Sequence, residues 1–130
     1  MFGRPPSGTF ADGVSRIAYS DADLAGRRYV IDLMRAAGLD PRLDPAGNIF
    51  GRRAGTDQAL PPILFGSHID SVPNGGNSDG DLSVIASLGA LEAVKAANMT
   101  TRHPLEMVTW AHEKSTAFGR RARTAVAIPE

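Results

Sequence analysis

The chain has 130 residues, with 14 Lys plus Arg balanced by 14 Asp plus Glu, and no cysteine. That length suits one domain with a modest core. The charge balance gives no overall field that would hold nucleic acid or an anionic membrane, and the lack of cysteine excludes disulfide frameworks and thiolate metal sites. No run reaches the ~18 apolar residues of a membrane helix, and Met1 to Phe10 lacks the features of a secretory signal. We therefore expect a soluble cytoplasmic protein with neither a nucleic-acid nor a membrane partner.

The first expected element is a helix that begins after Ser20. Ser20 is a suitable N-cap, and Asp23 can return a hydrogen bond to the amide of the cap. Gly38 supplies a left-handed stop. The apolar positions between them recur at helical spacing: Leu24, Val30, Ile31, Met34 and Ala37.

Two kinds of strand follow the first helix. Pro45 and Gly47 suit a tight turn, so residues 42–51 predict a hairpin of two short strands. The near-continuous apolar run from Pro62 to His68 predicts a central strand that is covered on both faces. Residues 105–111 predict a second central strand, parallel to the first through a right-handed crossover.

A helix is expected between these two central strands, starting just after Asp81. Because it is apolar around most of its circumference, we expect it to be buried, with Gly89 allowing close approach to the sheet. The apolar residues are Leu82, Val84, Ile85, Ala86, Leu88, Leu91 and Val94. Strands alternating with helices predict an α/β fold.

The chemistry is concentrated in a glycine-rich loop from Gly66 to Asp81, which carries His68, Asp70 and Asp79. Ligands in open α/β sheets bind at the carboxyl ends of the strands, and Glu113 follows the next strand. Imidazole and carboxylate are ligands for zinc and similar ions. A nearby carboxylate such as Glu113 can take a proton from metal-bound water, and Asp70 can accept the other ring N–H of His68.

Other functions of these residues remain open at this point. A lone histidine at a strand end is more often a hydrogen-bonded surface or core residue than a ligand, Asp79 followed by glycine is usually a turn, and Glu113 suits a cap or surface position. His103 is expected in an exposed loop, and His112 is expected as a loop side chain and not as a third ligand. Clustering favours a metal site, with glycines turning the loop so that Asp79 approaches His68: Gly75, Gly76 and Gly80.

The segment 66–81 resembles the dinuclear zinc amidohydrolases of the aminoacylase and carboxypeptidase superfamily, in particular the N-carbamoyl-L-amino-acid hydrolases and allantoate amidohydrolases. The resemblance covers about residues 8–118, through the segments 12–16, 19–23, 44–48 and 101–106. It implies a partial three-layer α/β/α catalytic domain of the zinc-exopeptidase type with a mostly parallel central sheet.

The resemblance also implies roles for individual residues. His68 would bind one of two divalent ions, Asp79 would bridge both, Asp70 would orient His68, and Glu113 would be the general base. The ions would be zinc, or manganese, cobalt or nickel. Where the family has a glutamate ligand to the second ion, this chain has Lys114. An ammonium about 4 Å from a divalent ion would be strongly repelled unless it turned away or lost its proton.

Further departures lie nearby, at Ser78, Ser83 and residues 115–117, and 119–130 form a divergent tail. Residues 1–130 resemble the N-terminal part of a catalytic domain, without the later ligands and the domain through which the family forms homodimers. Three functions follow: hydrolysis of a linear amide or ureido C–N bond in a small molecule, a non-catalytic truncated remnant, or a subunit that another chain completes.

Overall fold

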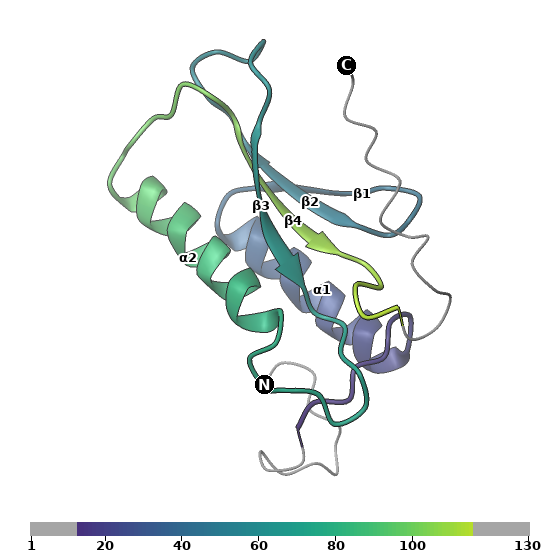
Figure 1. Cartoon of the computed structure of the whole chain (residues 1–130). Coiled ribbons are helices and arrows are strands. Elements are labelled where there is room, and N and C mark those ends of the chain that lie inside the picture. Colours follow the sequence, from purple (N-terminus) through teal and green to yellow (C-terminus); the bar gives the residue numbers. More distant parts are fainter. Residues whose placement is uncertain (1–12, 116–130) are drawn as a thin grey trace.

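The computed structural model describes residues 13–115, so the expectations for residues 1–12 and for the tail from 119 to 130 lie outside it. The described residues form two helices and one four-stranded sheet, in which the strand order is β1-β2-β4-β3 (Figure 1). In chain order the elements are α1 (Asp21–Ala36), β1 (Asp40–Leu43), β2 (Ile49–Arg53), β3 (Ile63–His68), α2 (Asp81–Ala96) and β4 (Leu105–Trp110). The predicted α/β fold is confirmed.

The sheet is mixed. β3 and β4 are parallel, as predicted, whereas β1 pairs with β2 and β2 pairs with β4 in antiparallel directions. The mostly parallel sheet that the resemblance implies is therefore not what the described residues form. The short connection between β1 and β2 dictates the first antiparallel pair, because parallel neighbours need a much longer crossover.

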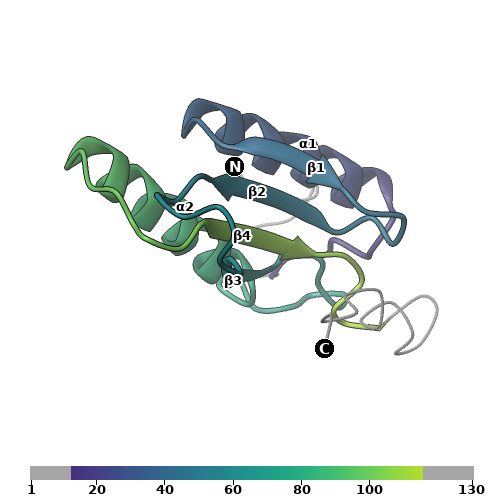
Figure 2. The same cartoon turned by 90° about the horizontal axis from the view of Figure 1, so that it is seen from above.

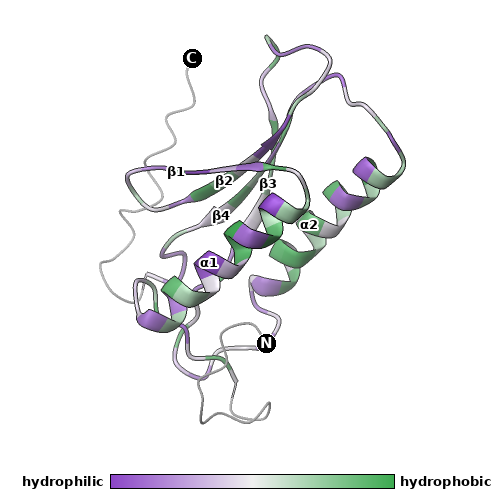
Figure 3. Ribbon diagram, turned by 180° about the vertical axis from the view of Figure 1, so that it is seen from behind, coloured by the Kyte–Doolittle hydropathy of each residue, from purple (hydrophilic) through white to green (hydrophobic). Residues whose placement is uncertain are grey.

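Both helices lie on the same face of the sheet (Figures 2 and 3). Met34 of α1 and Leu88 of α2 belong to one buried cluster with Met107 of β4. The space over the sheet at Gly51 is filled from α1, since a Cβ there would lie 3.0 Å from the sulfur of Met34. The described residues thus provide two of the three expected layers.

The first helix has the expected cap with one difference. The Ser20 side chain accepts a hydrogen bond from the backbone N–H of Asp23 at 3.3 Å. The Asp23 carboxylate in turn accepts the N–H of Tyr19 at 2.9 Å, one residue before the predicted position. Val30 and Met34 are fully buried, but Leu24 is 41% exposed and lies off the apolar face.

The predicted hairpin is formed by β1 and β2, and its turn is tied to the end of β4. Asp44 accepts hydrogen bonds from the backbone and side-chain nitrogens of Asn48, both at 2.8 Å. Gly47 has a φ of +86°, which favours glycine. The side-chain oxygen of Asn48 then accepts the backbone N–H of Ala111 at 2.8 Å. This contact fixes the chain where it leaves β4.

Two burial predictions are wrong for the described residues. β3 is an edge strand here, with no described strand beside its outer edge, and Ile63 and Leu64 are 52% and 42% exposed. α2 buries one stripe, made of Val84, Leu88 and Leu91, and leaves the apolar residues Leu82 and Ile85 exposed.

The predicted close approach at Gly89 does not occur either, since a Cβ at this position would meet no atom within 4 Å. Neither helix in residues 13–115 combines the length and apolar character that crossing a bilayer requires.

Candidate metal centre

The candidate site lies where the parallel strands β3 and β4 end. His68 is the last residue of β3 and pairs in register with Trp110, the last residue of β4. Chain segments leaving these two ends therefore meet at one edge of the sheet. They enclose a cavity of about 590 Å³, which is lined by Gly66, Ser67, His68, Asp79, Trp110, Glu113 and Lys114.

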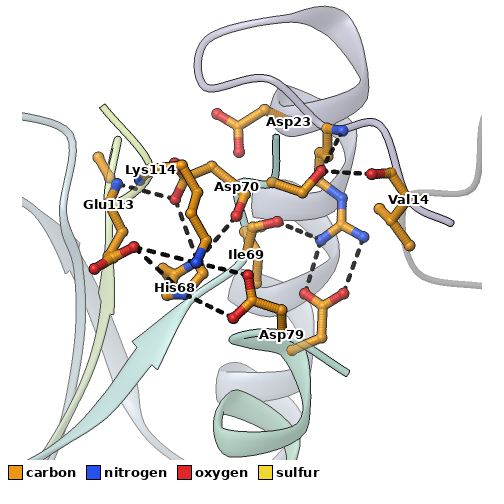
Figure 4. A network of polar contacts seen from close by, with 12 residues as sticks. Val14, Asp23, His68, Ile69, Asp70, Asp79, Glu113 and Lys114 are labelled. Carbon is orange, nitrogen blue, oxygen red and sulfur yellow. Dashed lines mark hydrogen bonds and ion pairs between the residues drawn. The ribbon is translucent and has the colours of Figure 1, made fainter. Parts of the chain in front are cut away.

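The structure brings together the side chains that the sequence singles out (Figure 4). The Nε2 atom of His68 lies 4.0 Å from an Asp79 carboxylate oxygen and 3.7 Å from a Glu113 carboxylate oxygen. His68 is buried, with only 6% of its surface exposed. The imidazole thus presents one nitrogen to two carboxylates across the cavity.

The other ring nitrogen of His68 is held by Asp70, though not as predicted. Nδ1 lies 2.9 Å from the backbone carbonyl oxygen of Asp70 and 3.5 Å from its carboxylate. A carbonyl only accepts hydrogen bonds, so Nδ1 carries the proton and Nε2 is the nitrogen available to a ligand or a second proton. Burial opposes protonation, but the contacts with Asp70 and the charge of Glu113 outweigh it and raise the pKa of His68.

The Asp70 carboxylate has a role that the sequence did not reveal. It accepts the backbone N–H of Glu113 at 3.1 Å and that of Lys114 at 2.9 Å, and so fixes the turn that carries both side chains. Burial raises the pKa of Asp70, yet the contact of its carboxylate with His68 and the hydrogen bonds from these two amides outweigh burial and hold the pKa below its ordinary value.

Of the three loop glycines, Gly80 has the clearest structural requirement. Its φ is +73°, and an added Cβ would lie 2.4 Å from the backbone oxygen of His68 and 2.5 Å from an atom of its ring. Gly75 forms a backbone bridge with Val14, and a Cβ at Gly76 would meet only Asp79, at an ordinary contact distance of 3.8 Å. Gly80 therefore allows the loop carrying Asp79 to close against His68.

A buried arginine, Arg16, holds this loop in place. It lies in the segment 12–16 that carries part of the resemblance, but no role was predicted for it. Arg16 is completely buried and donates to the carbonyl of Ile69 at 2.7 Å and to the Asp81 carboxylate at 2.8 and 3.2 Å. It thereby joins the chain just after β3 to the first residue of α2. Its role could not be predicted because Arg16 lies outside the helices and strands, so no periodicity marks it.

The side chain of Lys114 lies between the carboxylates of Asp79 and Glu113 (Figure 4). Its ammonium lies 2.6 Å from one oxygen of Asp79 and 3.6 Å from an oxygen of Glu113. The hydrogen bond to Asp79 raises the pKa of Lys114. A cation that belongs to the chain therefore offsets part of the negative charge of the two carboxylates.

The two remaining histidines lie outside the cavity lining. His103 lies in a loop, where its ring contacts the carbonyl of Pro61 at 2.9 Å. His112 follows β4, as expected for a loop side chain, but it is buried and stacks on the ring of Tyr19 at a centroid distance of 5.9 Å.

Known proteins are similar to this chain in sequence and in fold. Ureidoglycolate hydrolase from Arabidopsis thaliana is 40% identical over 106 residues, which are 82% of this chain and 22% of that protein. N-carbamoyl-L-amino-acid amidohydrolase from Paenarthrobacter aurescens is 42% identical over 106 residues, 82% of this chain and 26% of that protein. The crystal structure of a hydantoinase/carbamoylase family amidase from Burkholderia ambifaria matches 88% of this chain with a TM-score of 0.80 and 38% identity. The chain is a homologue of these amidohydrolases.

The homology confirms the resemblance to the N-carbamoyl-amino-acid hydrolase branch. It also confirms that the chain has the α/β fold of these proteins. The chain spans about a quarter of the length of these proteins. The matched part is 22%, 26% and 27% of the length of the three proteins named above. No family model matches the chain.

The described residues do not fit a pair of divalent ions as they are arranged. Within residues 13–115, no group of three or more His, Cys, Asp or Glu side chains is placed to hold an ion. Zinc ligands bind at about 2.0–2.3 Å, and the ammonium of Lys114 already occupies the space between Asp79 and Glu113 at 2.6 and 3.6 Å. Of the expected ligands, His68 and Asp79 lie 4.0 Å apart.

Proposed function

We propose that the described residues form part of an amidohydrolase active site that hydrolyses a linear amide or ureido C–N bond in a small molecule. The substrate class comprises N-carbamoyl amino acids, ureidoglycolate and allantoate. The observation that carries this proposal is the convergence of Glu113 and His68, 3.7 Å apart, in a cavity at the carboxyl ends of two parallel strands. The names of the homologues support the reaction class.

Glu113 is the proposed general base. Its side chain is 25% exposed, so water can reach it while the protein still limits its motion. The carboxylate takes a proton as water attacks the carbonyl carbon, and it returns that proton to the nitrogen when the C–N bond breaks. Asp70 is a positioning residue, because its carboxylate holds the backbone N–H of Glu113.

His68 and Asp79 are the proposed ligands of this chain for one divalent ion: zinc, manganese, cobalt or nickel. The imidazole is preset for this by the bond between Nδ1 and the Asp70 carbonyl, which leaves Nε2 directed at Asp79. The donors that complete the ion's coordination and bind the substrate would come from further polypeptide, since the homologues are about three to four times as long as this chain.

The proposal is tested in a chimera. Residues 13–115 replace the homologous segment of the Paenarthrobacter aurescens amidohydrolase, with Lys114→Glu, and release of ammonia from N-carbamoyl amino acids is measured. We expect hydrolysis, and we expect Glu113→Gln to lower kcat by about a hundredfold to ten-thousandfold. Glu92→Gln changes an exposed carboxylate on α2 and is the matched control. A folded chimera without hydrolysis, or equal effects of the two substitutions, would overturn the proposal.

The contact between Lys114 and Asp79 favours a second candidate function, a non-catalytic scaffold that keeps the fold and has lost the reaction. The same chimera with Lys114 retained separates the two. Hydrolysis close to that of the Lys114→Glu chimera excludes the scaffold, whereas activity that appears only after Lys114→Glu supports it for the chain as it stands.

A further inference from the structure

The centre of the candidate site holds a cation that is covalently part of the chain. Lys114 contacts Asp79 at 2.6 Å, which is a charge-assisted hydrogen bond, and faces Glu113 at 3.6 Å. Its side chain is only 23% exposed, whereas a solvated surface lysine extends into water. The ammonium is therefore a built-in part of the site.

The backbone keeps Lys114 in this position. Its N–H donates to the buried Asp70 carboxylate at 2.9 Å, next to the equivalent bond from Glu113. The neighbouring Ser115 has a φ of +55° and its N–H bonds to the carbonyl of His112, so the chain turns sharply just after the lysine. The turn directs successive side chains, Glu113 and Lys114, into the same cavity.

We propose that the ammonium of Lys114 takes the place of one of the two divalent ions, so that the site accepts at most one ion and does so only by displacing Lys114 from Asp79. One positive charge offsets part of the negative charge of Asp79 and Glu113, where a metal pair would otherwise do so. An ion bound to Asp79 would lie within a few ångströms of the ammonium, and at such distances the repulsion weakens binding by at least about tenfold. The inference rests on the proposed function only for the assignment of His68 and Asp79 as ligands.

Zinc titration of the full chain by calorimetry tests this inference. We expect the unchanged chain to bind no more than one zinc ion, and Lys114→Ala to bind zinc at least about tenfold more tightly. Lys114→Gln removes the charge but keeps a polar side chain that is only one atom shorter, and it should give a gain in the same direction if Lys114→Ala does not fold. Lys95→Ala removes an exposed lysine from the last turn of α2 and should change nothing.

Adding Asp79→Asn to Lys114→Ala should abolish the gain, which locates it at this site. Two zinc ions on the unchanged chain, equal affinities of the Lys114 and Lys95 variants, or a gain that survives Asp79→Asn would each overturn the inference. Because the readout is zinc binding, the inference can fail while the chimera still hydrolyses its substrate. Equally, the chimera can lack hydrolysis while the zinc titration still supports the inference.

Discussion

The Asp70 carboxylate accepts the backbone N–H of Glu113 at 3.1 Å and so joins the loop after β3 to the loop after β4. The same Asp70 residue holds the imidazole of His68 through its backbone carbonyl. One residue thus sets the positions of the proposed base and of a proposed ligand. Its contribution should be visible in the stability of the protein as well as in its chemistry.

Replacing Asp70 with Asn should reduce stability in a pH-dependent way. The buried carboxylate loses part of its hydrogen bonding, so the free energy of unfolding should fall by about 1–3 kcal/mol at about pH 5.5. Because the pKa of Asp70 is lowered by folding, its contribution is present above the unfolded pKa, near 4, and is lost as the pH falls through the folded pKa.

At higher pH, the dependence of stability on pH should come from His68. Its pKa is raised by folding, so the contribution of the protonated ring is present below the unfolded pKa, near 6.5, and is lost as the pH rises through the folded pKa. Urea unfolding of the unchanged chain and of Asp70→Asn, measured as a function of pH, should show the largest difference in the free energy of unfolding between about pH 4 and about pH 6.5. A difference that does not vary with pH would contradict the proposed coupling of Asp70 and His68.

Gly80 and Gly89 form a matched pair for testing the loop closure. Gly80→Ala forces a Cβ to within 2.4 Å of the His68 carbonyl at a φ of +73°, so unfolding should become easier by more than about 2 kcal/mol. Gly89→Ala lies inside α2 with nothing within 4 Å and should stabilise the protein by about 0.5–1 kcal/mol. Thermal unfolding measures both, and equal effects would show that the loop does not close against His68 as described.

The buried ion pair of Arg16 and Asp81 should matter far more than an exposed one. Asp81→Asn leaves a completely buried guanidinium without its full counter-charge, and should lower the free energy of unfolding by about 3 kcal/mol. Asp32→Asn breaks the pair with Arg35, whose side chains are 70% and 64% exposed, and should cost less than about 1 kcal/mol. Urea unfolding decides this, and similar costs for the two variants would contradict the burial of Arg16.

The elements that the sequence predicts well are those with local signals. Ser20 caps α1, Gly47 turns the hairpin, and the apolar runs ending at His68 and Trp110 form parallel neighbours. Apolar character alone did not predict burial: Leu64 in β3 is exposed, as are residues of α2, because cover depends on segments distant in sequence and not on the run itself. The antiparallel place of β2 beside β4 has no local signal either.

The candidate site shows the same division. Residue types and spacing were enough to select His68, Asp79 and Glu113, which the fold places around one cavity. The hydrogen bonds that hold these side chains in place could not be predicted from the residue types and their spacing. Asp70 uses its carbonyl for the ring and its carboxylate for two amides, and Arg16 supports the loop from a part of the chain more than fifty residues away. Such contacts arise only when the chain is folded.

The most direct test of the role of Lys114 is a nitrogen-resolved NMR spectrum of the lysine ammonium groups during zinc addition. Lys95 is the only other lysine in the chain and serves as an internal reference. We predict that metal-free protein shows a slowly exchanging Lys114 ammonium distinct from that of Lys95, that Asp79→Asn removes the distinction, and that zinc does the same. A Lys114 signal that matches Lys95 before any metal is added, or one that stays unchanged while zinc binds at His68 and Asp79, would contradict the account.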